Sequence, residues 1–274
     1  MASKRKRFGS FWLYVLLSVG GLAMLFPFVW MVLTSFKTGS DIYSFSLIPH
    51  PFVSANYATV LGKTNFLRWF ANSLFIGTVT TVSVLCFDTL TGYTLCKMSF
   101  PGKNLIFVLI LSTLMVPTEM LVIPWYLMSS KLGWMNTYWS IMFPGVISAF
   151  GIFMIRQFFE GVPNDLIEAA RIDGLNEFGI YWRIALPLIK PAISALAIFT
   201  FLGNWNAFLW PVIIISDYAL YTLPVGLSLF STDAGSQWEL IMTAASMATV
   251  PVLIVFMIFQ RQIIEGIHLS GMKS

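Results

Sequence analysis

The sequence predicts an all-α integral membrane protein with six transmembrane helices and both termini in the cytoplasm. Three observations support this fold class: an apolar composition, six long stretches with few charges, and an uneven distribution of Lys and Arg among the loops. Of the 274 residues, 57% are hydrophobic and 10% are charged, against about 45–50% and about 25% in an ordinary soluble domain. So few charges cannot cover a water-soluble surface, and a chain this apolar is not intrinsically disordered either.

A helix that crosses a bilayer core of about 30 Å needs roughly 20 mainly apolar residues. We expect six such spans, at residues 11–34, 70–95, 105–127, 138–155, 192–215 and 240–259. The first follows the basic residues 4–7, a pattern also found in signal peptides. Its apolar run continues through the bulky Phe28 and Trp30, which is too long for a signal peptide, so we expect an uncleaved span.

The positive charges predict which side each loop faces, because cytoplasmic loops retain Lys and Arg. Twelve of the sixteen basic residues fall on one side of the six spans, and this side includes both chain ends. The other side receives Lys37, Lys63, Arg68 and Lys131. The basic excess therefore indicates membrane topology, with membrane lipid as a partner and no nucleic acid.

The expected spans divide the chain into a basic N-terminal tail (1–10), a transmembrane domain (11–260) and a C-terminal tail (261–274), both tails cytoplasmic. The outer segment 216–239 contains an apolar stretch, 219–230, interrupted by Pro224. This stretch is too short to cross a bilayer, so we interpret it as a re-entrant or interfacial segment.

The sequence carries no motif for catalysis or for metal binding. It has no phosphate-binding loop and no nucleophile elbow, and its two histidines, His50 and His268, lack the spacing of metal ligands. The two cysteines, Cys86 and Cys96, are too few for a disulfide framework. We therefore expect a chain that is not an enzyme and binds no cofactor itself, and whose energy comes from another chain or from an ion gradient.

Residues 160–191, between the fourth and fifth expected spans, are polar and of mixed charge, which predicts a folded loop. A helix should begin after Pro163 and end near Ile172, where Gly174 provides a turn. Asn176 can cap a second short helix that Pro187 ends. From periodicity alone, an amphipathic hairpin that lies on the membrane is an equally good interpretation.

The residues of this loop resemble a known motif. The pattern consists of Glu168-Ala169-Ala170, then Gly174 after three residues, then Ile184-Ala185-Leu186-Pro187 after nine more. It resembles the EAA loop of the permease subunits of binding-protein-dependent ABC importers, with every position filled at its proper spacing. Further positions are similar to the carbohydrate branch, in particular to the shorter maltose-permease subunit: Asn56-Tyr57, Asn72-Ser73, Trp205-Asn206 with Pro211, and the segment 260–266.

The resemblance implies a type I ABC importer permease fold in the bacterial inner membrane. It implies a heterodimer with a second permease, two ATP-binding subunits that hold ATP and Mg²⁺, and an extracytoplasmic substrate-binding protein. The cargo implied is a sugar, a polyol or a sugar derivative, with glycerol phosphate as a neighbouring class.

The resemblance also implies roles for the loop residues. The residues expected to contact the ATPase are Glu168, Ala169, Ala170, Asp173 and Gly174. Those expected to anchor the loop to the membrane domain are Ile184, Leu186 and Pro187. For Asp173, a helix cap without a partner contact is the alternative.

Two carboxylates lie inside the expected spans, where each costs roughly 2.5–3.5 kcal/mol on insertion. For Asp88 we favour a hydrogen bond to a neighbouring helix over a position in the substrate path. Glu119 lies between two prolines, and for it a cavity-lining role and a structural role are equally good interpretations. In the alternative function, a secondary transporter driven by an ion gradient, both are proton or cation sites, but such a transporter has no use for the loop. Further candidates for the substrate path are Trp125, Tyr126, Trp205, Asn206 and Trp210.

Overall fold

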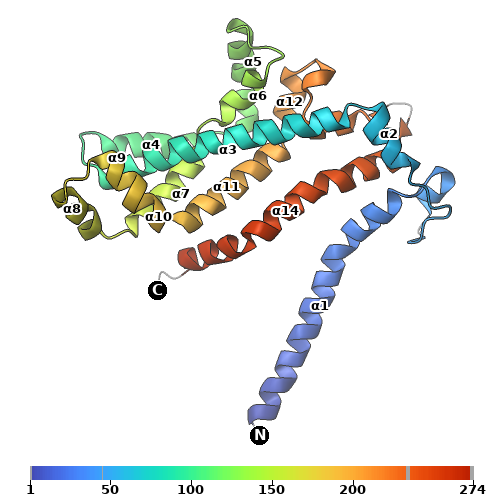
Figure 1. Cartoon of the computed structure of the whole chain (residues 1–274), viewed down its shortest axis with the longest axis horizontal. Coiled ribbons are helices and arrows are strands. Elements are labelled where there is room, and N and C mark those ends of the chain that lie inside the picture. Colours follow the sequence, from blue (N-terminus) through green and yellow to red (C-terminus); the bar gives the residue numbers. More distant parts are fainter. Residues whose placement is uncertain (1, 45, 233–234, 272–274) are drawn as a thin grey trace. The chain divides into compact units, whose positions relative to one another are not determined.

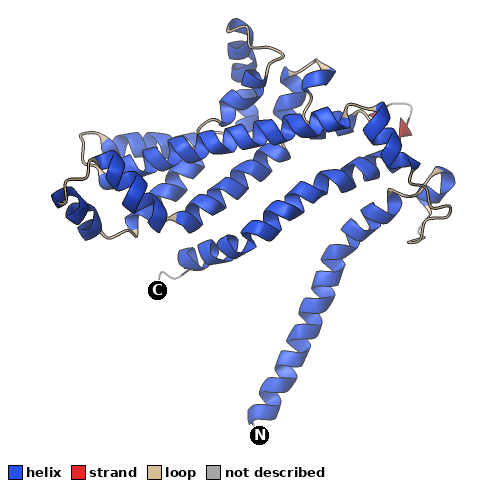
Figure 2. Cartoon of the chain, in the orientation of Figure 1, coloured by secondary structure: helices blue, strands red, loops and turns tan. Residues whose placement is uncertain are grey.

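The computed structural model describes residues 2–44, 46–232 and 235–271 (Figure 1). Its regular structure is almost entirely helical, which confirms the all-α class (Figure 2). The longer helices are α1 Ala2–Thr34, α2 Ala55–Lys63, α3 Phe66–Lys97, α4 Lys103–Thr113, α5 Val122–Lys131, α7 Ala149–Glu160, α8 Asn164–Ile172, α11 Lys190–Trp205 and α14 Trp238–Gly271. The shorter ones are α6 Tyr138–Met142, α9 Glu177–Ile180, α10 Leu186–Leu188, α12 Leu209–Ile214 and α13 Leu223–Ser228.

Short 3₁₀ or π segments connect several of these helices: η1 Gly39–Tyr43, η2 Thr118–Leu121, η3 Phe143–Gly145, η4 Tyr181–Ala185 and η5 Tyr218–Leu220. The strands β1 Ser231–Thr232 and β2 Gly235–Ser236 form a small antiparallel pair in which Ser231 lies opposite Ser236. The expected tails largely continue the terminal helices, since α1 begins at Ala2 and α14 reaches Gly271. Met1 and residues 272–274 lie outside the described residues.

Three described helices are long and apolar enough to cross a membrane: Leu13–Thr34 within α1, α3, and Trp238–Ile258 within α14. They correspond to the first, second and sixth expected spans. Three bent helix pairs bring the number to six if each pair is one span. The bends are 92° between α4 and the η2–α5 segment, 41° between the α6–η3 segment and α7, and 82° between the α9–α10 segment and α11.

The third expected span, 105–127, is not the continuous helix that its composition suggested. The helix α4 ends at Thr113, and Pro117 takes an extended conformation with φ −58° and ψ 131°. Proline has no N–H for a helical hydrogen bond, and it restricts the residue before it to extended conformations. The chain therefore turns sharply before α5 begins.

The fifth expected span, 192–215, is interrupted in the same way. The helix α11 ends at Trp205 and α12 begins at Leu209. Pro211, in the first turn of α12, would clash with the carbonyl of Ala207 if one helix ran through both segments. The proline is tolerated because the first turn of a helix needs no N–H at that position.

The chain divides into two compact units, of which the first contains residues 1–67 and 226–250. Its centre is the chain reversal after α1. The Asn56 side chain donates hydrogen bonds to the carbonyl oxygens of Ser35 and Lys37, at 2.8 and 2.9 Å. The hydroxyl of Thr243 donates to the Ser35 carbonyl at 3.1 Å. These bonds satisfy backbone carbonyl groups of the turn that follows α1.

The second unit contains residues 68–225 and 251–274. One apolar cluster joins α3, α7, the α8–α10 segment and α11; its buried members include Tyr93, Ile155, Ile167, Ile180 and Leu196. A second cluster joins α3 to α6 and α12 through Ile76, Ile141 and Ile214. In Figure 1 the α8–α10 segment lies at the end of α3 that carries Lys97.

The first part of the expected re-entrant stretch is a short folded segment held by α3. The Asn72 side chain donates to the carbonyl oxygens of Ala219 and Tyr221, both at 2.9 Å. The hydroxyl of Ser73 accepts the N–H of Leu223 at 2.7 Å. As predicted, the helical pieces here, η5 and α13, are too short to cross a bilayer.

Helices α3 and α7 pack closely at glycines. A Cβ on Gly92 would lie 2.8 Å from Cγ2 of Ile155, so only glycine fits without a shift. The carboxylate of Asp88, which is fully buried, accepts the backbone N–H of Ser148 at 3.1 Å. Ser148 is the N-cap of α7, where a negative charge is favoured by the helix dipole. The structure thus contains a hydrogen bond from α7 to Asp88, of the kind that the sequence favoured.

Gly151→Ala tests this helix contact, because the added methyl group would collide with the second carboxylate oxygen of Asp88. We expect the free energy of unfolding to fall by about 1–3 kcal/mol. Gly203→Ala is the control, since a Cβ there meets nothing within 4 Å. The thermal-unfolding midpoint in detergent measures both effects, and equal midpoints for the two variants would contradict the assignment.

Candidate functional site

The segment from Asn164 to Leu188, called here the α8–α10 hairpin, has the predicted arrangement of a helix, a glycine turn and a second helix. Gly174 has φ +85°, a conformation that glycine adopts without strain. Its N–H donates to the Arg171 carbonyl at 3.1 Å, and the N–H of Leu175 donates to the Ala170 carbonyl at 3.0 Å. These two bonds form a Schellman motif, which satisfies carbonyl groups at the end of α8.

The second half of the hairpin begins with the predicted cap. The side-chain oxygen of Asn176 accepts the N–H of Gly179 at 2.8 Å. After one turn of α-helix the chain forms the π segment η4, and α10 then continues to Leu188. The helix thus runs one residue beyond Pro187, which was expected to end it, because Pro187 lies in the first turn of α10 and needs no helical N–H there.

The hairpin is fixed to the membrane helices by apolar packing and by hydrogen bonds. Tyr181 is buried against Tyr93 of α3, and its hydroxyl lies 2.7 Å from that of Thr89. The ammonium group of Lys97 donates to the carbonyl of Val162 at 2.6 Å and to the side chain of Asn164 at 2.8 Å. A movement of the hairpin must therefore displace the end of α3 as well.

An ion pair links the two halves of the hairpin. Nε of Arg171 lies 2.7 Å from one carboxylate oxygen of Glu177, and the other oxygen accepts the hydroxyl of Tyr93 at 3.1 Å. The Arg171 guanidinium lowers the pKa of Glu177 below its usual value. The sequence did not predict this pair, because the two residues are six apart across a turn and follow no helical spacing.

The hairpin residues expected to contact a partner differ in exposure. Glu168, Ala169, Asp173 and Gly174 are exposed, whereas Ala170 is 3% exposed and belongs to the apolar core. Ala170 thus faces inward in this structure, which favours a packing role for it over direct contact with a partner. Of the expected anchor residues, Ile184 and Leu186 pack against the same core and Pro187 is exposed.

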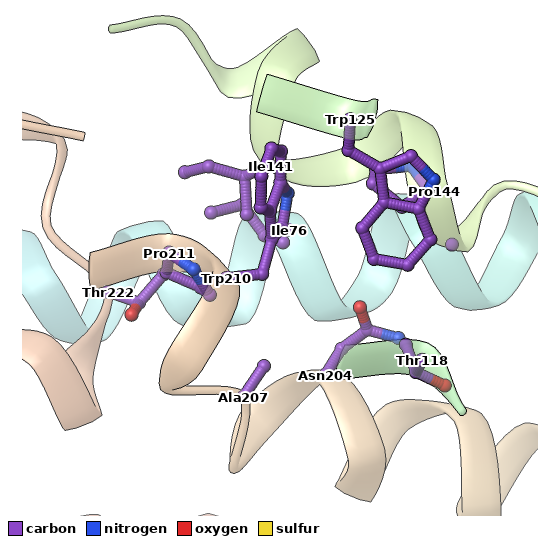
Figure 3. A pocket seen from close by; sticks show the side chains of 11 residues that line it. Ile76, Thr118, Trp125, Ile141, Pro144, Asn204, Ala207, Trp210, Pro211 and Thr222 are labelled. Atoms are coloured by element: carbon purple, nitrogen blue, oxygen red, sulfur yellow. The ribbon is translucent and has the colours of Figure 1, made fainter. Parts of the chain in front are cut away.

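A cavity of about 190 Å³ lies in the second unit, where the prolines interrupt the spans. Trp125 and Trp210 line it with their ring centroids 5.7 Å apart and nearly perpendicular. The indole N–H of Trp210 donates to the Ser140 carbonyl at 2.9 Å. The amide of Asn204 donates to the Thr200 carbonyl at 2.8 Å, and Figure 3 shows its oxygen pointing toward Trp125.

The cavity contains only part of the predicted substrate path. Trp205 is buried against Phe70 and Phe201 instead, and Asn206 is exposed and donates to the Leu202 carbonyl at 2.9 Å. Tyr126 and Glu119 are exposed and do not line the cavity, nor does Asp88. Three polar residues that the sequence analysis did not single out do line it: Thr118, Asn204 and Thr222. Two asparagines flank Trp205, and helical periodicity could not decide which one faces the cavity.

The comparison with protein families decides the identity of the chain. The family described as the inner membrane component of binding-protein-dependent transport systems matches residues 88–268. The chain belongs to this family. It is therefore a permease subunit of an importer and a multi-pass protein of the inner membrane, as the resemblance implied. Nothing supports the alternative of an ion-gradient-driven transporter that uses Asp88 and Glu119.

Individual members of the family are similar over nearly the whole chain. The arabinooligosaccharides transport system permease protein AraQ of Bacillus subtilis is 36% identical over 257 residues, which is 92% of each chain. The lactose transport system permease protein LacG of Rhizobium radiobacter is 31% identical over 97% of each chain. A chain of a bacterial ABC transporter that imports the acidic polysaccharide alginate has a TM-score of 0.83 at 25% identity, covering 93% of this chain and 96% of its own. The expected importer permease fold is thereby confirmed.

Glu177→Gln tests the ion pair within the hairpin. Because Arg171 lowers the pKa of Glu177 below 4.5, the stabilisation is complete above that pH and is lost as the pH falls through the lowered pKa. We expect the variant to reduce the hydrogen-exchange protection of the hairpin amides at pH 7 and to make no difference in strong acid. Glu168→Gln is the control, since Glu168 is exposed and forms no ion pair within the described part of the chain. Equal protection of wild type and Glu177→Gln at pH 7 would refute the role of the pair.

Proposed function

We propose that this chain is one of two permeases in an ATP-driven importer of a sugar or sugar-like solute. In this proposal it forms a heterodimer with a second permease, with both termini of the chain in the cytoplasm. Two ATP-binding subunits hold the ATP and Mg²⁺, a substrate-binding protein delivers the cargo from outside, and this chain catalyses no reaction itself.

The relatives support this cargo and these partners. Their names specify arabinooligosaccharides, lactose and sn-glycerol 3-phosphate as transported solutes. A second structure of a bacterial alginate ABC transporter is a complex with a periplasmic protein bound to an alginate pentasaccharide. Its matching chain is similar in fold, with a TM-score of 0.66 at 13% identity over 90% of this chain and 92% of its own. Two of the three named solutes are built of sugars, as is alginate, and this favours a carbohydrate.

The α8–α10 hairpin is the observation that carries the proposal. Its outer surface combines the exposed residues Glu168, Ala169, Asp173 and Gly174 with large apolar side chains, since Ile172 is 86% exposed and Phe178 is 66% exposed. Apolar exposure of this kind on an otherwise polar segment is typical of a binding surface. We assign the four exposed residues to the contact with the ATPase, and Ile184, Leu186 and Pro187 to the attachment of the hairpin.

The attachment of the hairpin supports its role in coupling. Its inner face packs in one cluster with α3, α7 and α11, and protein interiors transmit strain because they are closely packed. When a docked ATPase moves the hairpin, the membrane helices must follow. In this proposal the two adjacent alanines have different roles: the exposed Ala169 contacts the ATPase, and the buried Ala170 packs in the apolar core.

Ala169→Arg is the test, performed on the chain expressed with the products of its neighbouring genes and purified by a tag on this chain. We expect wild type to recover a second permease and an ATP-binding chain, and the variant to lose the ATP-binding chain at least tenfold while retaining the second permease. Ala169→Ser is the conservative control and should retain both. Ala170→Arg should instead lower the yield of folded protein, because it places a charge in the core.

Full recovery of the ATP-binding chain with Ala169→Arg would overturn the docking surface proposed here. Recovery of this chain without any ATP-binding chain, even as wild type, would overturn the importer assembly itself.

A further inference from the structure

Three basic side chains from different helices converge next to the α8–α10 hairpin. Lys97 is the last residue of α3, Lys103 is the first residue of α4, and Arg156 lies in the C-terminal half of α7. All three are half-buried. Together with Glu160 they lie within electrostatic reach of the Cys96 thiol. The three residues therefore form one group, called here the basic cluster.

Hydrogen bonds to neutral oxygen atoms hold the two lysines in place. Lys97 makes the two hydrogen bonds described above for the hairpin. The ammonium group of Lys103 donates to the carbonyl oxygens of Cys96 and Met98, at 3.1 and 2.9 Å. An ammonium group has three N–H donors, so within the described part of the chain each lysine uses two of them and retains one for a ligand.

The positive charge of the basic cluster is only partly neutralised. The guanidinium of Arg156 lies 3.9 Å from the ring centroid of Phe107 in α4, and its Nη2 atom is 3.0 Å from a carboxylate oxygen of Glu160. Among the charged groups that surround Cys96, three cations and one carboxylate leave two positive charges in excess. An anion with several oxygen atoms would balance this charge and accept the remaining N–H donors.

The surroundings of the basic cluster favour a lipid over a dissolved anion. None of the residues of α4 is buried, and Leu105, Val108 and Leu109, which closely follow Lys103, are each more than half exposed. The acyl chains of a lipid would cover this apolar surface while its headgroup reaches the cations. Basic pockets between transmembrane helices bind the headgroups of anionic phospholipids in this way.

From these observations we propose that the basic cluster binds the phosphate group of an anionic phospholipid and that this lipid strengthens the attachment of the α8–α10 hairpin to α3. Lys97 provides the link, because it belongs to the cluster and also donates to Asn164 of the hairpin. The lipid lies in the leaflet on the side of the hairpin, which is the cytoplasmic leaflet in the proposed orientation. The inference depends neither on the proposed cargo nor on the proposed contact with the ATPase.

Lys103→Gln and Arg156→Gln are the test variants, since each removes one positive charge and retains a side chain that can donate hydrogen bonds. Lys103→Arg is the conservative variant, which retains the charge. Lys190→Gln is the matched control: it removes the charge of an exposed lysine at the start of α11, outside the basic cluster.

The experiment is native mass spectrometry of the full-length chain, with any subunits that copurify, titrated with phosphatidylglycerol or with phosphatidylcholine of the same acyl chains. We expect wild type to bind phosphatidylglycerol at least about fivefold more tightly than phosphatidylcholine, and each Gln variant of the cluster to lose about fivefold in affinity for phosphatidylglycerol. Lys103→Arg and Lys190→Gln should bind it as wild type does. Phosphatidylglycerol should also slow hydrogen exchange of the hairpin amides in wild type, and less so in Lys103→Gln.

Equal affinity of wild type for the two lipids, or unchanged affinity for phosphatidylglycerol in both Gln variants of the cluster, would overturn the lipid site. Displacement of phosphatidylglycerol by millimolar inorganic phosphate would assign the cluster to a soluble anion instead. Lipid binding without slower exchange would overturn the effect on the hairpin. None of these outcomes decides the proposed import of sugars, so the failure of one proposal is distinguishable from the failure of the other.

Discussion

The contact between α3 and α7 is the interaction on which both candidate sites depend. Gly92 and Gly151 bring the two helices close together, and the Asp88 carboxylate accepts an N–H at the start of α7. The continuous helix α3 passes from Ile76 in the cavity to Lys97 beneath the hairpin. At 1.5 Å per residue this distance is about 30 Å, so one continuous helix connects the α8–α10 hairpin with the cavity.

The cavity lies beside two interruptions of helices. Pro117 and Pro211 end straight paths that the hydrophobic composition alone would allow, and Trp125 and Trp210 lie just after these breaks. Within a membrane, non-helical backbone is tolerated where it is covered by protein or lines a cavity. Thr118 and Pro211, at these interruptions, both line the cavity.

The sequence predicted best those features that depend on a few neighbouring residues. The glycine turn at Gly174 and the cap at Asn176 need only local backbone geometry, and both occur as expected. The EAA pattern indicated the family correctly, but it could not separate Ala169 from Ala170. These neighbours lie about 100° apart around a helix, and the hairpin's packing partners come from distant segments. Helical periodicity likewise could not decide which of the asparagines on either side of Trp205 faces the cavity. The ion pair between Arg171 and Glu177 could not be predicted either, because it depends on the turn that brings the two residues together.

The position of Asp88 has a consequence for how the chain is made. Its hydrogen-bond donor, the backbone N–H of Ser148, is synthesised 60 residues later, so α3 reaches the insertion machinery before this donor exists. A free carboxylate at the centre of a lipid-exposed helix opposes release into lipid by roughly 2.5–3.5 kcal/mol. The helix α3 should therefore stay beside the translocon until α7 emerges, and the two should enter the bilayer together as a preassembled pair.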